Sequence, residues 1–268
     1  MSDMVVDTSR TRVEARPAGF FRDLISVAGR ALRAVPREPE FMIPAIVVPV
    51  FFYFVNIGAL ENVAEQGGVP NFRAFQLPVA IIFAVTGISR ASALVTDIQN
   101  GYFDRLLMTP IRRITLLLGL MVADLATVAA LTIPVLGLGF IMGVDFGTGL
   151  GGVLLFMFMG ALWGLAFTGF PYAIALKTGN PAAVNTSFIL FFPFAFLTTS
   201  FLPKEALSGW LQDVATYNPV TYLLGGMRAL FVDWDVGDIA EGFAAIVGVG
   251  IISMTLALLA LHGRVKRG

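Results

Sequence analysis

The sequence contains no cysteine and only one histidine among its 268 residues. The missing cysteine excludes disulfides, thiolate metal sites and cysteine nucleophiles. No H-E-x-x-H or G-x-S-x-G motif is present, and the single histidine, His262, is expected to anchor the chain at the membrane interface. Nucleophilic and metal-dependent catalysis lack candidate residues, so we expect neither an enzyme nor a metal site.

Charged residues are scarce and evenly balanced. Only 13% of the residues are charged, and the 18 basic and 18 acidic side chains cancel. Net charge therefore gives no sign of a nucleic-acid partner, and none is expected. By contrast, 57% of the residues are hydrophobic and the mean hydropathy is +0.81. A soluble domain of this length cannot bury so much apolar surface, and the composition predicts an all-α integral membrane protein.

Six hydrophobic segments are long enough to cross a membrane, which takes about 20 apolar residues. They cover residues 41–60, 77–96, 114–144, 150–176, 183–202 and 243–262. The third and fourth exceed the minimal length, so we expect them to tilt or to extend beyond the bilayer. We divide the chain into a disordered cytoplasmic tail (1–16), an amphipathic helix (17–37) and a six-span transmembrane domain (38–268).

The amphipathic segment 17–37 combines an apolar stripe with arginines on its other faces. Leu24 and Ala28 follow each other at helical spacing, and Arg22 and Arg30 lie on other faces. This pattern predicts a helix in the membrane interface, with its basic face toward the anionic headgroups of membrane lipids. An ordinary soluble helix is the alternative, which the hydrophobic segment beginning at residue 41 makes less favourable.

The positions of the basic residues predict the orientation of the chain. Fourteen of the 18 lysines and arginines lie in the N-terminal region, in residues 97–113, in the 177–182 turn or at the C-terminal end. Three lie in the alternate connections. The positive-inside rule therefore places both termini and residues 97–113 in the cytoplasm of a multi-pass cell-membrane protein.

Two charged residues lie deep within predicted spans. Arg90 belongs to the second span and Asp124 to the third, and both approach from the cytoplasmic side. At about 1.5 Å per residue they reach a similar depth, so we predict a structural ion pair that locks the two spans together. A substrate site is the alternative role for this intramembrane polar pair.

The connection over residues 202–240 is too polar for a span and too apolar for a free loop. Two short helices, over 204–216 and 220–232, would be separated by the Asn218-Pro219 step. Helices of half the membrane thickness dip into the bilayer only where protein shields their ends. A gate over a pathway and a simple interfacial hairpin are equally compatible with this pattern.

Residues 97–113, DIQNGYFDRLLMTPIRR, form a polar segment between the second and third spans. Its charged rim and apolar side chains would suit insertion into the cleft of a partner protein. The rim consists of Asp104 and Arg105, and the apolar residues are Phe103, Leu106 and Leu107. A solvated loop with an incidental helical pattern is the alternative.

Together with six spans and cytoplasmic termini, several short motifs carry a resemblance to a known family. They are GYFDRLLMTPIRR (101–113), SFLP (200–203), GWLQ (209–212), YNPVT (217–221) and RAL (228–230). The chain from about Arg16 to its end resembles the membrane (permease) subunits of ABC exporters of the daunorubicin-resistance type. The matched motifs lie in two separated regions, which makes the resemblance specific.

The resemblance implies a role for each region. The segment between the second and third spans would be a coupling helix that docks on an ATPase, the amphipathic helix would be a connecting helix, and the short outer helices would close the exit. The implied coupling residues are Gly101, Phe103, Asp104, Arg105, Leu106, Leu107, Pro110 and Arg112, and the implied outer gate is Pro203, Trp210, Leu211, Asn218, Pro219 and Arg228. Relatives often carry an acidic cluster before the glycine, whereas here Asp97 is followed by Ile98, Gln99 and Asn100.

The resemblance also implies partners and cargo. The chain has no G-x-x-x-x-G-K-[ST] loop, so ATP and Mg²⁺ would bind to a separate ABC ATPase, in two copies. A second copy of this permease, or a homologous one, would complete the pathway among the membrane lipids. The cargo would be a hydrophobic or amphiphilic molecule: a drug, an antibiotic, a lipid or a glycolipid. Alternatives are export of a polysaccharide or teichoic acid and, outside this family, an ATP-independent transporter or membrane enzyme.

Overall fold

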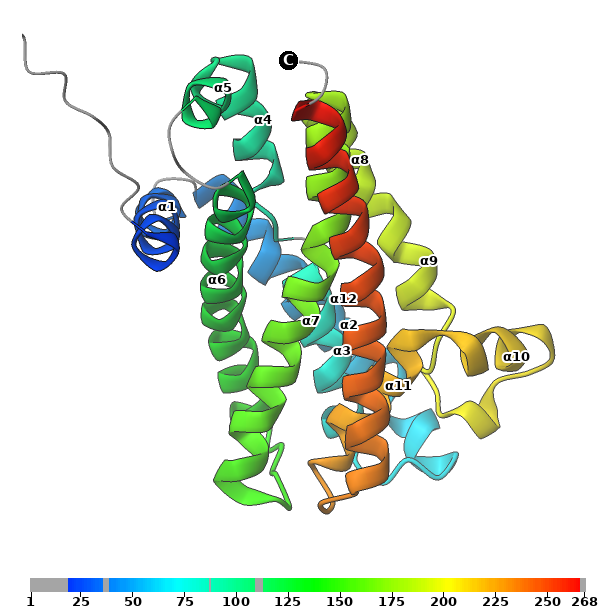
Figure 1. Ribbon diagram of the computed structural model, residues 1–268. Coiled ribbons are helices and arrows are strands. Elements are labelled where there is room, and N and C mark those ends of the chain that lie inside the picture. Colours follow the sequence, from blue (N-terminus) through cyan, green and yellow to red (C-terminus); the bar gives the residue numbers. More distant parts are fainter. Residues whose placement is uncertain (1–18, 36–38, 87, 109–112, 266–268) are drawn as a thin grey trace, which may run out of the picture.

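The protein is known from a computed structural model that describes residues 19–35, 39–86, 88–108 and 113–265, and these residues form helices and no strands. Figure 1 shows their arrangement. The elements are α1 (Phe20–Ala34), α2 (Pro39–Gln66), α3 (Phe72–Thr86), α4 (Ala91–Gln99), α5 (Tyr102–Leu107), α6 (Arg113–Ile141), α7 (Gly149–Thr178), α8 (Pro181–Thr186), the 3₁₀ turn η2 (Ser187–Leu190), α9 (Phe191–Phe196), the 3₁₀ turn η3 (Lys204–Ala206), α10 (Trp210–Tyr217), α11 (Pro219–Ala229) and α12 (Val236–Val265). The predicted tail at 1–16 lies outside the described residues.

Within the described ranges, five helical segments are long and apolar enough to cross a membrane. They are α2, the α3–α4 segment Phe72–Gln99, α6, α7 and α12. Their apolar lengths of 25 to 30 residues exceed the span requirement of about 20 residues. The prediction of an all-helical multi-pass membrane protein is confirmed, and five of the six predicted spans correspond to these segments.

The remaining predicted span, at 183–202, is not confirmed as one long helix. The chain there forms α8, η2 and α9, an apolar run of Pro181–Phe196 that is shorter than a span. Pro193 lies inside α9 and has no N–H to continue the hydrogen-bond ladder. The hydroxyls of Thr198 and Ser200 both donate to the carbonyl of Ala195, at 2.8 and 2.7 Å, and satisfy the end of the helix. Local polar groups therefore stop a segment whose average hydropathy predicts a span.

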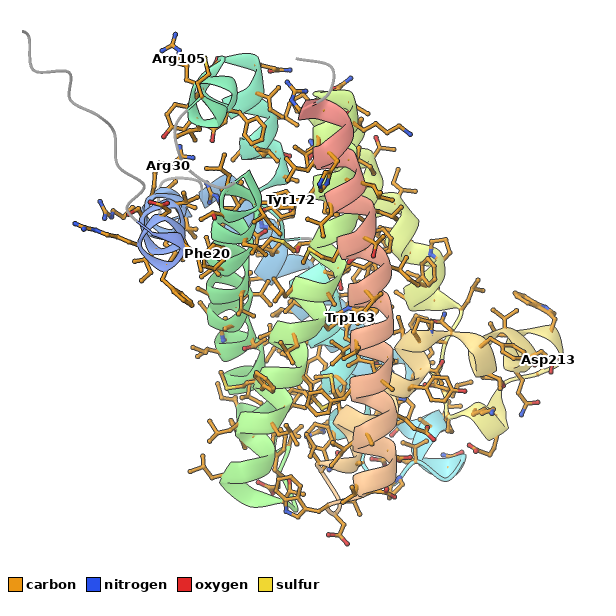
Figure 2. The ribbon with its side chains drawn as sticks, viewed as in Figure 1. Phe20, Arg30, Arg105, Trp163, Tyr172 and Asp213 are labelled. Carbon is orange, nitrogen blue, oxygen red and sulfur yellow. The ribbon has the colours of Figure 1, made fainter. Side chains whose placement is uncertain are left out.

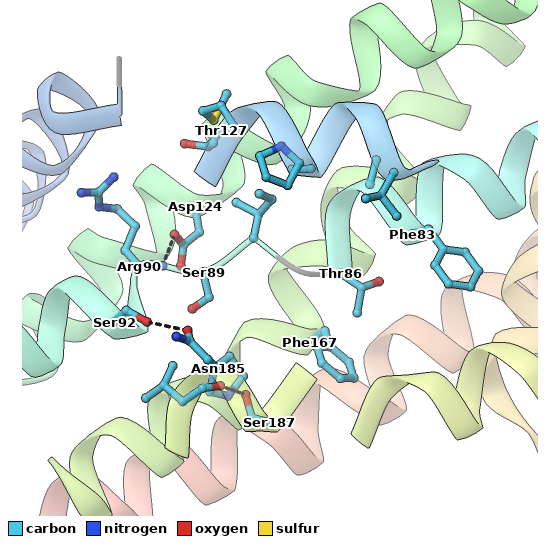
Figure 3. A pocket seen from close by; sticks show the side chains of 18 of the residues that line it. Phe83, Thr86, Ser89, Arg90, Ser92, Asp124, Thr127, Phe167, Asn185 and Ser187 are labelled. Atoms are coloured by element: carbon cyan, nitrogen blue, oxygen red, sulfur yellow. Dashed lines mark hydrogen bonds between the residues drawn. The ribbon is translucent and has the colours of Figure 1, made fainter. Parts of the chain in front are cut away.

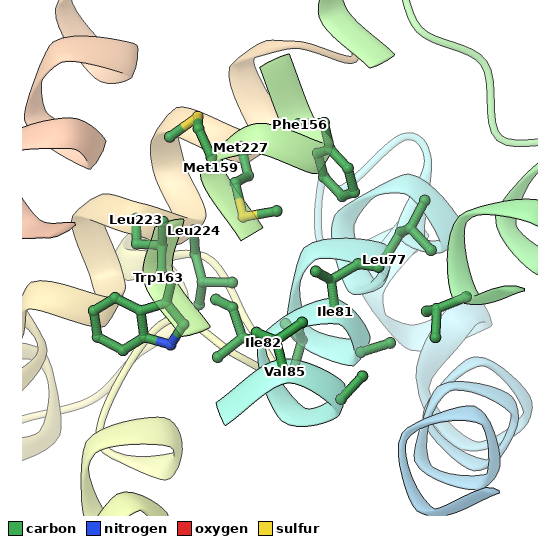
Figure 4. Close-up of a cluster of buried hydrophobic side chains, with 14 of the residues drawn as sticks. Leu77, Ile81, Ile82, Val85, Phe156, Met159, Trp163, Leu223, Leu224 and Met227 are labelled. Carbon is green, nitrogen blue, oxygen red and sulfur yellow. The ribbon is translucent and has the colours of Figure 1, made fainter. Parts of the chain in front are cut away.

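Helix α7 forms the centre of the bundle. Its Trp163 and Phe156 are each no more than 1% exposed, and the Trp163 indole donates to the Thr86 hydroxyl at 3.0 Å. Figure 4 shows this core, in which side chains of α3, α7 and α11 meet. Because lipid tails are as apolar as these side chains, van der Waals packing and interhelical hydrogen bonds, rather than the hydrophobic effect, hold α3 and α11 against α7.

Helix α12 packs along the other side of α7 at very short range. A Cβ atom added to Gly169 would lie 2.5 Å from the backbone carbonyl carbon of Ser253. The Ser253 hydroxyl donates to the carbonyl of Ala166, one turn before Gly169. A glycine at this position lets the two backbones touch, as small residues commonly do between membrane helices.

The helices place the predicted cytoplasmic and outer elements in opposite halves of the molecule. Figure 1 shows α5, α8 and the last turn of α12 at one end, with α1 alongside the neighbouring part of α6. At the other end, the N–H of Gly147 in the α6–α7 loop donates to the carbonyl of Phe231 at 2.9 Å. Helix α11, in the outer connection, lies in that half of the molecule. Which end faces the cytoplasm stays a prediction.

Candidate functional site

Helices α4 and α5 form a short arm at one end of the bundle. Gly101 joins them with a φ of 68°, a left-handed conformation that glycine adopts without strain. Phe103 is 3% exposed and lies in a cluster with Leu116 of α6. This differs from the expectation that Phe103 inserts into a partner, because α5 uses it to pack against its own chain. Among the described side chains of α5 and the residue after it, Tyr102, Arg105 and Met108 are exposed.

Part of the predicted coupling set is not described by the structure. Pro110 and Arg112 lie outside the described residues, and the side chains of Asp104 and Leu107 are not described. Leu106 is half-buried and borders the cluster around Phe103. Of the predicted coupling residues, Arg105 is thus the one whose side chain is described and exposed.

Helix α1 is joined to the arm by one arginine. Arg30 donates to the carboxylate of Asp97 at 2.9 Å, and its guanidinium carbon lies 4.7 Å from the centre of the Tyr102 ring. Partial burial opposes the charge, but the hydrogen bond and negative charge of Asp97 raise the pKa of Arg30 above its ordinary value. Figure 2 shows Arg30 facing the arm and Phe20 on the opposite side of α1. The contact connects α1 to both helices of the arm.

The second predicted span is interrupted between α3 and α4, and Asp124 of α6 lies at this break. Asp124 is fully buried; the backbone N–H of Arg90 donates to its Oδ1 at 2.9 Å, and the Tyr172 hydroxyl donates to its Oδ2 at 2.6 Å. Arg90 and Asp124 therefore do meet, but through the main chain of Arg90. Among the described residues the ion pairs are Arg30–Asp97 and Arg73–Glu61, so the predicted side-chain pair takes a different form. Figure 3 shows the contact.

A cavity of about 730 Å³ opens beside the break. It is bounded by α2, α3, α4, α6, α7, α8 and the segment that leads into α9. Its apolar wall includes Phe52, Phe83, Phe167 and Phe192, together with Pro49 of α2 and Pro171 of α7, which both lie inside helices. Its polar groups include Thr86, Ser89, Ser92, Thr127, Asn185 and Ser187 (Figure 3). The volume lies in the usual range for small-molecule pockets, about 300–1,000 Å³.

The predicted outer-gate residues fall into two groups. Asn218 donates to the carbonyls of Phe194 and Leu197, each at 2.9 Å, and Arg228 donates to the Thr199 carbonyl at 2.9 Å. Both residues thus hold the segment that follows α9, and Pro219 begins α11 between them. By contrast, α10 projects away from the bundle (Figure 1). Of the remaining gate residues, Trp210 is 67% exposed, and Leu211 and Pro203 are half-exposed.

The sequence profile of the ABC-2 type transporter family matches residues 22–232. The chain belongs to this family. The matched region runs from the first turns of α1 to just beyond α11 and includes the arm, the break at Arg90 and Asp124, and the outer residues up to Arg228. It also covers most of the cavity wall.

Two relatives of this ABC-2 permease carry drug-resistance names. A daunorubicin resistance ABC transporter permease protein of Streptomyces coeruleorubidus is 26% identical over 231 residues, which cover 82% of this chain and 80% of the relative. A Mycobacterium tuberculosis protein, named as a probable doxorubicin resistance ABC transporter permease, is 25% identical over 214 residues, covering 78% and 76%. The resemblance to permease subunits of this type is confirmed.

Two connections of the permease could not be found by sequence reasoning. Tyr172 and Asp124 lie on different spans, and no spacing rule pairs them. Arg30 and Asp97 are 67 residues apart, and only the packing of α1 on α6 brings them together. Only the contact of Asp124 had an indirect signal in the sequence, because an acid inside an apolar span needs hydrogen-bond donors nearby.

Replacing Arg30 with glutamine should loosen the arm while leaving the permease folded. The pair is partly exposed, with 46% and 24% of the two side chains accessible, so its loss should cost about 0.4–1 kcal/mol. Backbone amides of α5 should then exchange with deuterium about two- to fivefold faster, the factor equivalent to that free energy. Arg33→Gln, on an exposed position of α1, should leave exchange unchanged. An unaltered exchange rate in Arg30→Gln would contradict the role of the Arg30–Asp97 contact. The double variant Arg30→Asp plus Asp97→Arg, which exchanges the two charges, should restore the wild-type exchange rate.

Proposed function

We propose that this permease exports hydrophobic or amphiphilic molecules across the cell membrane, driven by ATP hydrolysis on a separate ATPase that docks at the α4–α5 arm. One observation carries the proposal: α4 lines the cavity through Ser92 and Ala93, and the same helix carries α5. A displacement of the arm by a docked partner therefore changes the wall of the cavity directly.

The cavity favours a substrate of a particular chemical class. Aromatic side chains from α2, α3 and α7 supply an apolar wall, and hydroxyl and amide groups gather near the start of α4. An amphiphile matches this division, with its apolar part along the phenylalanines and its polar part near Ser92 and Asn185. A drug, an antibiotic, a lipid or a glycolipid fits this description. The volume and the apolar wall favour such a molecule over a polysaccharide or teichoic-acid chain.

The assembly we propose contains two permeases and two ATPases. Helix α2 exposes apolar side chains along most of its length, including Ile43, Phe51 and Val63 at 60–65% accessibility. Lipid or a second permease, identical or homologous, would cover this surface and complete the pathway. ATP and Mg²⁺ would bind on the ATPase subunits. Both termini and the arm would then face the cytoplasm.

Co-purification with candidate ATPases that carry a phosphate-binding loop tests the docking. The wild-type permease should retain its ATPase, and the double variant Asp104→Ala plus Arg105→Ala should lose at least 90% of it, because Arg105 is exposed on α5 and Asp104 directly precedes it in the sequence. Lys204→Ala plus Glu205→Ala, a neighbouring acid–base pair at η3 in the outer connection, is the matched control and should bind normally. The proposed function would be contradicted if no ATPase co-purified with the wild type and neither double variant changed this result.

A further inference from the structure

Asp124 places a carboxyl group inside an apolar span, where an unsatisfied polar group is costly. Its side chain is fully buried, and its two oxygens accept from two different elements. Oδ1 takes the Arg90 N–H at the start of α4, and Oδ2 takes the Tyr172 hydroxyl from the middle of α7. One carboxyl group therefore joins α4, α6 and α7.

The contact at Arg90 has a specific structural reason. The first N–H groups of any helix lack partners within that helix, and α4 begins where the span is interrupted. Ser89 accepts the Ala91 N–H at 3.1 Å, and Asp124 accepts the Arg90 N–H. Irregular backbone at membrane depth persists only where protein supplies such acceptors. Asp124 thus replaces the carbonyl that an uninterrupted helix would have provided.

The same residues form part of the cavity wall. Thr86, Ser89, Arg90, Asp124 and Thr127 all border it (Figure 3). Since α4 carries α5, any rotation of the arm about the break moves the Arg90 N–H relative to Asp124. The hydrogen bond must lengthen or break during such a movement, so its strength helps to set the resting orientation of the arm.

We infer that Asp124 is a positioning residue that fixes the arm at the break and links its orientation to the cavity. Tyr172 holds the carboxyl group against α7 while the Arg90 N–H attaches the arm to it. The consequence for transport rests on the proposed function, whereas the mechanical role of Asp124 belongs to the permease alone. Loss of the carboxyl group should release the arm without removing the surface on which an ATPase would dock.

The arm can be observed directly because the chain has no native cysteine. Met108 is 81% exposed at the end of α5, and Ile141 is 84% exposed at the far end of α6. Spin labels on Met108→Cys and Ile141→Cys report the position of the arm, because pulsed electron–electron double resonance in nanodiscs measures the distance between them. The doubly labelled wild-type background should give one narrow distance distribution. Asp124→Leu should at least double its width, because leucine has a similar size but offers no acceptor to the Arg90 N–H or the Tyr172 hydroxyl. Thr127→Val is the matched control, since Thr127 also borders the cavity but bonds only within α6, to the Ala123 carbonyl.

An unchanged width in folded Asp124→Leu would overturn the inference. If that variant is not recovered in folded form, Asp124→Glu keeps the acceptor but displaces it by one methylene group. It should shift the mean distance, and an unchanged distribution would again overturn the inference. The measurement needs no ATPase, so the two proposals fail separately. If the distance distribution broadens but no ATPase binds, the proposed function alone is contradicted. If an ATPase binds but the distance distribution does not change, the positioning role alone is contradicted.

Discussion

Replacing Gly169 with alanine should destabilise the permease by about 3 kcal/mol, the upper end of the usual cost of overpacking. The added Cβ would lie 2.5 Å from the carbonyl carbon and 2.6 Å from the carbonyl oxygen of Ser253. These are backbone atoms, so relief requires α7 and α12 to separate and cannot come from a side-chain rotation. Separation would also break the bond from the Ser253 hydroxyl to the Ala166 carbonyl. Thermal unfolding in detergent, followed by near-ultraviolet circular dichroism, measures the loss.

The matched control for Gly169 is another glycine in the same helix pair. Gly248 of α12 has no atom within 4 Å of an added Cβ, so Gly248→Ala should leave the free energy of unfolding unchanged or raise it by up to about 1 kcal/mol. Equal unfolding temperatures for the two variants would show that the α7–α12 contact in the membrane is looser than described.

Replacing Arg228 with methionine should have an effect of similar size, but for an electrostatic reason. Arg228 donates to the Phe75 carbonyl at 3.0 Å and to the hydroxyl and carbonyl of Thr199 at 3.1 and 2.9 Å. Its guanidinium carbon also lies 3.4 Å from the centre of the Phe75 ring. Methionine fills part of the volume but leaves these acceptors without their donors, which should cost about 3 kcal/mol in all. The loss would separate α3, α11 and the turn after α9.

Arg228→Lys distinguishes the geometry of the arginine from its charge. Lysine keeps the positive charge but lacks the planar fork that reaches three acceptors, so it should recover less than half of the stability. Arg105→Met, which alters an exposed arginine on α5, should change the unfolding free energy by less than about 0.5 kcal/mol. Full recovery by lysine would mean that charge alone holds α3, α11 and the turn after α9 together.

The membrane character of the chain could be predicted from composition, because burial in lipid requires long apolar helices. The end of the helix within segment 183–202 could not be predicted, because a hydropathy value is averaged over a window of residues. The hydroxyls of Thr198 and Ser200, by contrast, act on a single carbonyl. Arg90 and Asp124 were correctly placed near each other by depth along their helices. The form of their contact depended on the interruption between α3 and α4, which no periodicity in the apolar sequence indicated.

The arm was harder to predict than the spans. An exposed amphipathic helix and a helix folded against its own chain have the same spacing of apolar residues. Phe103 shows the ambiguity, since it is buried in a cluster that also holds residues of α4, α6 and α7. The importance of Arg30 could not be read from α1 alone, because its partners Asp97 and Tyr102 come from the distant arm.

The prolines in the cavity wall affect how selectivity would be encoded. Because a proline lacks an N–H, the carbonyl four residues before it loses its partner within the helix. Pro49 and Pro171 release the carbonyls of Ala45 and Phe167 in this way, and all four residues border the cavity. Where these carbonyls face the cavity, an apolar wall gains main-chain acceptors that a hydropathy plot does not show. Replacing the side chain of Ala45 or Phe167 would leave these carbonyls in place, so part of the recognition of hydroxyl or ammonium groups would be invisible to side-chain mutagenesis and would change only when the prolines do.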